Sequence, residues 1–187
     1  MAAKRGMSTA RKTMFGVLLL ALIGAGAWAA STLQGCEGDA ARAVETVEIK
    51  GQSFHLELAA NDATRIKGLS QRTEIAEDGG MLFVFKSAQP QNFVMRDCFV
   101  PIDIMFLDPL GTVLSTHAMT VEEPRGPGEG QVGDITNPQY SSRLTRYSSG
   151  RPAQFAIELK GGKIEELGVR KGDRIDLDYA RLKRLAK

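Results

Sequence analysis

The sequence predicts a mainly β fold, a compact rolled sheet or barrel of about seven to nine short strands with one or two short helices. Three observations predict it. Short apolar or alternating runs recur along the chain, turn-forming Gly, Pro, Asn and Asp residues separate them, and helical periodicity is confined to brief segments. Of the 187 residues, 43% are hydrophobic, so the chain can build one domain with a substantial core.

A hairpin and a short helix are the first elements expected. Residues 45–49 and 53–58 alternate between polar and apolar types on either side of a Lys-Gly-Gln turn, which predicts two antiparallel strands. Asn61 or Asp62 can then cap a helical turn over residues 65–67, and the following glycine ends it.

Four further strands are expected in the middle of the chain. Residues 81–85 form an uninterrupted apolar run after an Asp-Gly-Gly break, which is typical of a buried strand. Residues 92–97 alternate, and residues 102–107 and 111–119 flank an Asp-Pro-Leu-Gly turn. The last two segments therefore predict a pair of strands joined by a tight turn.

A long loop precedes the C-terminal elements. Residues 122–140 hold three Pro, four Gly and little apolar content, so we expect the most mobile part of the domain here, lying over one sheet edge as a lid. A tolerated insertion without a role is the alternative. The acids of this loop outnumber its single arginine, Arg125, so a partner of the loop would be cationic. Beyond it we expect a strand at 153–159, a helical turn at 163–167 and a last strand at 174–179.

The first 35 residues are predicted to be an export signal. Basic residues precede the uncharged apolar run 14–30, as in a secretory signal peptide. Residues 33–36 (LQGC) resemble a bacterial lipobox, which predicts lipidation of Cys36; cleavage near Ala30 and an uncleaved membrane anchor are the alternatives. Each of them places residues 37–187 in the bacterial cell envelope, outside the cytoplasm, and an N-terminal lipid or signal anchor would make the membrane a partner. Residues 36–44 are expected to be a tether and residues 45–187 a single domain.

Charge and cysteine content exclude several classes of protein. The formal net charge is +2, but without residues 1–35 the chain carries 20 basic and 22 acidic residues. A nearly neutral domain has no general attraction for nucleic acid, so we expect no nucleic-acid partner. Two cysteines cannot form a disulfide scaffold.

Metal and cofactor sites are not expected. His55 and His117 lie far apart in the sequence without a neighbouring cysteine, whereas a closed zinc site needs a full set of N, S or O ligands. Residues 128–133 spell G-x-G-x-x-G, but inside the long loop rather than between a strand and a helix, so they do not indicate a dinucleotide site. Cys98 is interpreted as a small core residue. A Cys36–Cys98 disulfide is an alternative that competes with lipidation.

Asp103 is the strongest anomaly in the pattern. Residues 102–107 are apolar on both strand faces, so the Asp103 carboxylate has buried surroundings and should be paired or protonated. Arg96 is the expected partner, with Asp97 close by. Two interpretations are open: an ion-pair or turn-capping network that fixes the strand crossing, or a polar cluster that lines a pocket.

Six short motifs follow one another along the chain: GLSQR at 68–72, GMLFVF at 80–85, FVMRD at 93–97, PID at 101–103, SGRPA at 149–153 and LGVRKGD at 167–173. Together they resemble the DUF192 (UPF0127) family, a domain of unknown function, over about residues 47–180. The resemblance implies a compact β-rich domain, often behind a signal sequence. It brings no established reaction, substrate or cofactor.

These observations predict an exported, membrane-associated binding domain rather than an enzyme. The expected site binds a small ligand or an envelope protein through a polar cluster of four residues: Arg72, Arg96, Asp97 and Asp103. The alternative is a hydrolase that uses Asp97 or Asp103 as its general acid/base.

Overall fold

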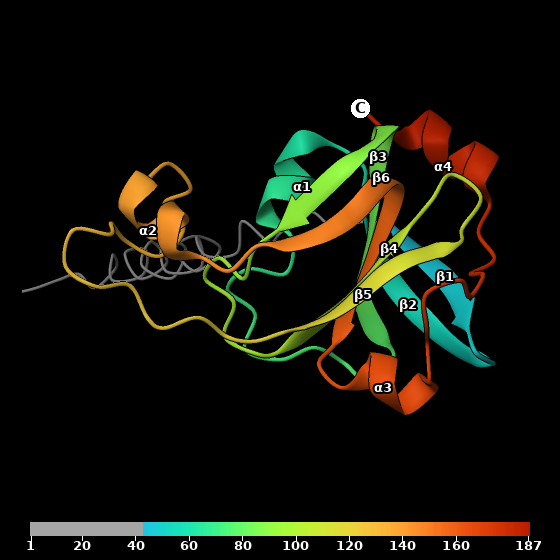
Figure 1. Ribbon diagram of the computed structural model, residues 1–187, viewed down its shortest axis with the longest axis horizontal. Helices are drawn as coiled ribbons and strands as arrows, with labels where there is room; N and C mark the ends of the chain where they lie inside the picture. The colour runs from blue at the N-terminus through green and yellow to red at the C-terminus, as the bar shows by residue number, and fades with distance from the viewer. Residues whose placement is uncertain (1–42) are drawn as a thin grey trace, which may run out of the picture. The chain divides into compact units, whose positions relative to one another are not determined.

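One six-stranded sheet organises the part of the chain that the computed structural model describes, residues 43–187 (Figure 1). The strand order is β1-β2-β3-β6-β4-β5; β2 and β3 are parallel, and the other neighbouring pairs are antiparallel. The strands are β1 (Val44–Ile49), β2 (Gln52–Ala59), β3 (Gly79–Phe93), β4 (Ile102–Leu107), β5 (Val113–Met119) and β6 (Tyr147–Lys160). The helices are α1 (Asp62–Lys67), α2 (Pro138–Arg143), α3 (Lys163–Leu167) and α4 (Tyr179–Leu185).

The mainly β class predicted from the sequence is confirmed, although the sheet stays open rather than closing into a barrel. Within residues 43–187 fewer strands form than expected, and β3 explains part of the difference. It continues past the apolar run 81–85 through a polar stretch to Phe93. Its pairing with β6 shifts register after Val84 and again after Pro90. Such bulges let a long strand bend, so the polar stretch does not end it, and the separate strand predicted at 92–97 is wrong.

The last predicted strand, at 174–179, is also wrong. There the chain makes only an isolated bridge between Thr112 and Arg174 before it turns into α4. The Asp178 side chain accepts a hydrogen bond from Arg181 N and so caps this helix. The cap starts a helix where residue alternation alone favours a strand.

The long loop contains a helix that its composition does not suggest. α2 begins after Asn137, whose side chain accepts a hydrogen bond from Tyr140 N. Pro138 occupies the first turn, where its missing N–H is not needed. The Asn-Pro pair was therefore a helix-start signal inside a segment predicted to be loop.

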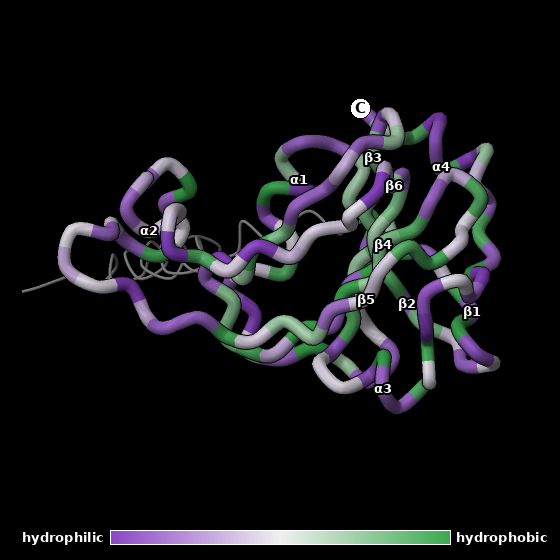
Figure 2. The backbone as a smooth tube through the Cα atoms, viewed as in Figure 1, coloured by the Kyte–Doolittle hydropathy of each residue, from purple (hydrophilic) through white to green (hydrophobic). Residues whose placement is uncertain are grey.

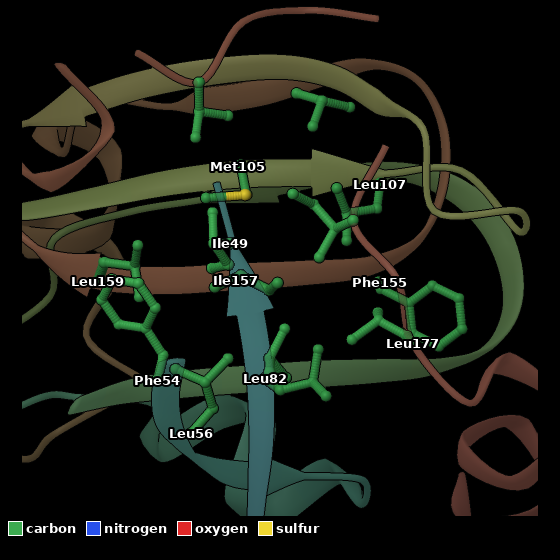
Figure 3. Packing of buried hydrophobic residues seen from close by; sticks show 14 of the residues in the cluster. Ile49, Phe54, Leu56, Leu82, Met105, Leu107, Phe155, Ile157, Leu159 and Leu177 are labelled. Atoms are coloured by element: carbon green, nitrogen blue, oxygen red, sulfur yellow. The ribbon is translucent and has the colours of Figure 1, made fainter. Parts of the chain in front are cut away.

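Each face of the sheet buries its own apolar cluster. We name the faces after two adjacent residues of β3, because side chains alternate along a strand. Leu82, Met105 and Ile157 belong to the cluster on the Leu82 face, which also includes Leu177 from the C-terminal segment (Figure 3). The cluster on the opposite, Phe83 face includes Phe83, Ile104, Phe106 and Ala156. Figure 2 shows hydrophobic residues concentrated along the central strands.

The predictions about the N-terminal segment concern other residues. The signal peptide, the lipidation of Cys36 and nearly all of the tether lie outside the residues that the structure describes. Residues Ala41–Lys187 form a compact unit of their own. Within residues 43–187, no helix combines the length and the apolar character needed to cross a membrane.

Candidate functional site

A cavity of about 500 Å³ opens on the Phe83 face, lined by residues of α1, of β3 and of the segment after β3. Its lining combines three kinds of side chain. Phenylalanine rings form an apolar part, amide side chains such as Gln89 and Asn92 form a polar part, and Arg65, Lys86 and Arg96 add positive charge. A pocket of this size with an apolar wall and a few polar groups is typical of a small-molecule site.

Three phenylalanines form one wall of the cavity. The Phe93 ring lies edge-on to Phe83, with ring centroids 4.9 Å apart, and its centroid is 6.4 Å from that of Phe85. Phe106 supports it, with its centroid 5.4 Å from Phe93. The bends in β3 make this arrangement possible, because they bring the last residue of the strand beside Phe83. We refer to Phe83, Phe85 and Phe93 as the phenylalanine wall.

Glu158 lines the same cavity from β6. Its cross-strand partners are Met81 in β3 and Ile104 in β4, so apolar side chains flank its carboxyl group. Only 6% of Glu158 is exposed, and its Oε2 has no hydrogen-bond partner among the described residues. Burial raises the pKa of Glu158 to about 8, so the neutral carboxylic acid is the main form at neutral pH.

Arg96 brings a second unsatisfied group to the cavity. Its terminal nitrogens donate to the Ile135 carbonyl and to Ser141 Oγ, each over 3.2 Å. Its Nε is buried without an acceptor. Within residues 43–187, Arg96 Nε and Glu158 Oε2 are the buried side-chain atoms that lack a hydrogen-bond partner, and both residues line this cavity.

Cys98 also lines the cavity, and its side chain is an uncharged thiol. Burial, together with the nearby Glu158 carboxyl, raises the pKa of the thiol to about 12. The Cys98 thiol is free and buried. The disulfide with Cys36 considered from the sequence involves a residue outside those that the structure describes. A thiol with so high a pKa is a poor nucleophile, which fits a packing role.

The comparisons with known proteins agree with this fold. Residues 45–177 match the DUF192 family, described as an uncharacterized ACR. The chain belongs to the DUF192 family. No curated protein matches it at a significant level. The family therefore supplies the fold and its boundaries without supplying a reaction.

Two solved structures resemble this DUF192 domain. One is a candidate transcription regulator from Sinorhizobium meliloti 1021, with 25% identity and a TM-score of 0.59 over 74% of this chain and 97% of that chain. The other is a protein of unknown function from Novosphingobium aromaticivorans DSM 12444, with 25% identity and a TM-score of 0.55 over 71% of this chain and 82% of that one.

Asp97, the neighbour of Arg96, is fully engaged outside the cavity. It adopts a left-handed backbone conformation, with a φ of 51°, which Asp tolerates better than most residues. Its carboxylate accepts from Arg125 Nε and Nη2 at 2.8 and 2.9 Å and from Gly133 N at 2.9 Å. Burial raises the pKa of Asp97, but the hydrogen bonds from Arg125 and Gly133 outweigh it and hold the pKa below its ordinary value. A carboxylate held in this way is poorly suited to general acid/base catalysis.

Asp103 lies on the opposite face of the sheet from Glu158. It pairs with Leu159 in β6, whose side chain belongs to the cluster on the Leu82 face. Asp103 is 3% exposed, and its carboxylate accepts a hydrogen bond of 2.8 Å from Ile164 N in the first turn of α3. The ion pair expected between Arg96 and Asp103 is therefore wrong, and the capping interpretation describes Asp103 better.

Arg72 lies apart from both carboxylates. Its guanidinium forms an ion pair of 2.6 Å with Glu57 on β2, and both side chains are partly exposed. Its neighbour Gln71 contacts Asp97 through the backbone, where Gln71 N donates to the Asp97 carbonyl over 2.7 Å. The four residues predicted to form one polar cluster thus divide among several locations, and of the four only Arg96 lines the cavity.

Sequence reasoning missed Glu158, although the signal was present. Glu158 interrupts the apolar run 153–159 as a single acid, in the same way that Asp103 interrupts its own strand. The structure also shows why position 80 is a glycine, because a Cβ there would lie 2.2 Å from the Glu158 backbone carbonyl oxygen. Only glycine lets β3 approach β6 so closely at this point.

The long loop is fixed by ion pairs as well as by α2. Glu129 accepts from Arg143 Nε at 2.7 Å, and this contact lowers the pKa of Glu129 to about 2. Arg125 and Arg143 stack on the Tyr140 ring, 3.8 and 4.9 Å from its centroid. The loop and α2 project beyond the sheet (Figure 1) and meet the cavity lining through the hydrogen bonds of Arg96. Within residues 43–187 no cluster of His, Cys, Asp and Glu side chains is arranged to hold a metal ion.

Proposed function

We propose that this DUF192 domain binds a small organic molecule in the cavity on the Phe83 face. The observation that carries the proposal is the pair of buried, unsatisfied atoms, Arg96 Nε and Glu158 Oε2, at one cavity. Leaving a buried polar group unpaired costs about 1–3 kcal/mol, and more when it is charged. A ligand that bonds to both groups removes this cost.

The hydrolase considered from the sequence has no comparable support. Asp97 is held by Arg125, and Asp103 caps α3 on the other face of the sheet. Neither carboxylate lines the cavity. The geometry therefore favours binding over catalysis by these two residues.

Native mass spectrometry tests the binding proposal. The mature chain, purified through a C-terminal tag and incubated with an extract of small envelope metabolites, should carry an added mass. Val94 lines the cavity, so Val94→Trp should fill it and abolish the added mass. Val132→Trp is the matched control, because Val132 is 55% exposed on the loop and does not line the cavity. Equal ligand loading of Val94→Trp and wild type would refute the proposal.

We also propose that the domain works in the bacterial cell envelope, attached to the membrane by a lipid on Cys36. The basic residues, the apolar run 14–30 and the lipobox-like residues 33–36 support this location. Labelling with a palmitate analogue should mark the wild type but not Cys36→Ser. A mature chain that begins near Ala30 would instead indicate ordinary cleavage, and an unlabelled wild type would refute lipidation.

A further inference from the structure

Resting on the proposed function, we infer that the ligand is an organic carboxylate with an apolar or aromatic body. Its carboxylate accepts one hydrogen bond from Arg96 Nε and one from the carboxylic acid of Glu158, and its body packs on the phenylalanine wall. Three separate observations lead to this class of ligand.

Arg96 sets the kind of group that the ligand presents. A guanidinium stays charged and only donates hydrogen bonds. Its terminal nitrogens are held by Ile135 and Ser141 from the loop and α2, so the side chain is anchored, and its buried Nε is the donor that has no acceptor. A carboxylate is the acceptor that forms the stronger, charge-assisted hydrogen bond with such a donor.

Glu158 supplies a second donor because it is neutral. Burial among apolar neighbours raises its pKa to about 8, and the nearby Cys98 remains a thiol to about pH 12. The charged and titratable groups around Glu158 are Asp62, Arg65 and Lys67 of α1, Lys86 of β3, Arg96 and Cys98 after β3, His117 of β5 beyond Ile104, and Lys160 on β6 itself. A protonated Glu158 Oε2 donates to a carboxylate rather than repelling it.

The net charge of the cavity lining is positive, which suits a negatively charged ligand. Four basic side chains line the cavity, and Asp62 is the one acid beside Glu158. Asp62 already forms an ion pair of 2.7 Å with Arg65, which weakens its field in the cavity. The remaining excess of positive charge attracts an anion and disfavours a cation.

Three matched probes test the inference: phenylpropanoate, the neutral phenylpropanamide and the cationic phenylpropylamine. They share one aromatic frame and differ in the group that would meet Arg96 and Glu158. By isothermal titration calorimetry on the mature chain at neutral pH, we expect the carboxylate to bind about tenfold or more tightly than the amide, and the amine not to compete.

The pH dependence tests the role of Glu158. Wild-type affinity for phenylpropanoate should fall about tenfold per pH unit above about pH 8, since the ligand requires the protonated acid. Glu158→Gln carries a donor at every pH, so its profile should be flat and it should bind more tightly than the wild type at about pH 9.5. A flat wild-type profile would overturn the assignment of Glu158 as the donor.

Arg96→Lys tests the other contact. It keeps the positive charge but has no Nε, so affinity for the carboxylate should fall about tenfold while the amide is affected less. Ser141→Ala is the control, because it removes one anchoring contact of Arg96 and leaves Nε in place, so it should lose less. Equal losses in the two variants would mean that Arg96 acts only through its anchoring.

The outcomes separate this inference from the proposed function. Tighter binding of the amine or the amide overturns the carboxylate class but keeps the cavity as a binding site. The same conclusion follows if none of the three probes binds but native mass spectrometry still shows an added mass on the wild type that Val94→Trp abolishes. If no probe binds and Val94→Trp also behaves as the wild type, both the inference and the proposed function fail.

Discussion

Two buried carboxylates of this DUF192 domain have opposite surroundings. Asp97 and Glu158 are each 6% exposed. Asp97 accepts three hydrogen bonds, two of them from Arg125, whereas Glu158 Oε2 accepts none among the described residues. Accordingly the pKa of Asp97 lies below its ordinary value and that of Glu158 is raised to about 8. Burial alone therefore does not mark a candidate functional acid; burial beside a cavity without a hydrogen-bond partner does.

Breaking the satisfied pair should give the largest effect. Arg125→Met leaves the Asp97 carboxylate buried without its counter-ion, which should lower the free energy of unfolding by about 3 kcal/mol. Urea denaturation at neutral pH measures this loss. The double variant Asp97→Asn/Arg125→Met carries no unpaired charge, so it should recover part of the stability. A double variant that is no more stable than Arg125→Met would show that the two side chains do not act as a pair.

Replacing the unpaired Glu158 carboxyl by a neutral amide should increase stability at high pH rather than reduce it. The pKa of Glu158 is raised from 4.5 to about 8 in the folded state, so folding binds a proton between these values. The stability that this proton provides is complete below about pH 4.5 and is lost as the pH rises through about 8. Relative to the wild type, Glu158→Gln should therefore gain stability as the pH rises, by roughly 3 kcal/mol between about pH 5 and about pH 7.5. A constant difference across this range would mean that Glu158 ionises normally.

Asp103 lies between Asp97 and Glu158 in the number of hydrogen bonds that its carboxylate accepts. It is buried and accepts a hydrogen bond from Ile164 N. Asp103→Ala should cost about 1–2 kcal/mol, because the amide at the start of α3 loses its acceptor. Asp103→Asn keeps a side-chain oxygen and should recover much of that loss, which thermal or urea unfolding can measure. If the two variants lost the same stability, the cap would not be the role of Asp103.

The sequence was sufficient to predict the positions of the strands that have a clear residue pattern. β1, β2, β4 and β5 were predicted within two residues of their observed ends, because one turn separates regular runs in each pair. β3 and β6 were truncated in the prediction, since β3 extends past its apolar run, and β6 extends ahead of its own, through polar residues on the far side of the register shifts. Capping side chains, such as Asp178 for α4, decided the helices that periodicity missed.

The candidate site was less predictable, because it depends on which residues face each other. Arg96 was identified, but its neighbours come from α1, β6 and α2, and sequence gives no register between them. Asp97 and Arg125 are 28 positions apart, and Arg125 lies on the long loop 122–140, which was expected to be mobile. Asp103 and Glu158 carry the same signal in sequence, and only the strand pairing shows that they point to opposite faces.

Breaking the partly exposed ion pair of Arg72 and Glu57 should have the smallest effect on stability. This pair contrasts with the buried pair of Asp97 and Arg125. The two side chains are 34% and 26% exposed and lie 2.6 Å apart, so water screens their attraction and solvates either one if it is left alone. Arg72→Gln should therefore change the free energy of unfolding by less than about 1 kcal/mol, and the difference should shrink further in about 1 M salt. Urea denaturation at low and high salt, with Arg125→Met run in parallel, measures both effects. A loss for Arg72→Gln as large as that for Arg125→Met, and unaffected by salt, would mean that burial does not separate these pairs.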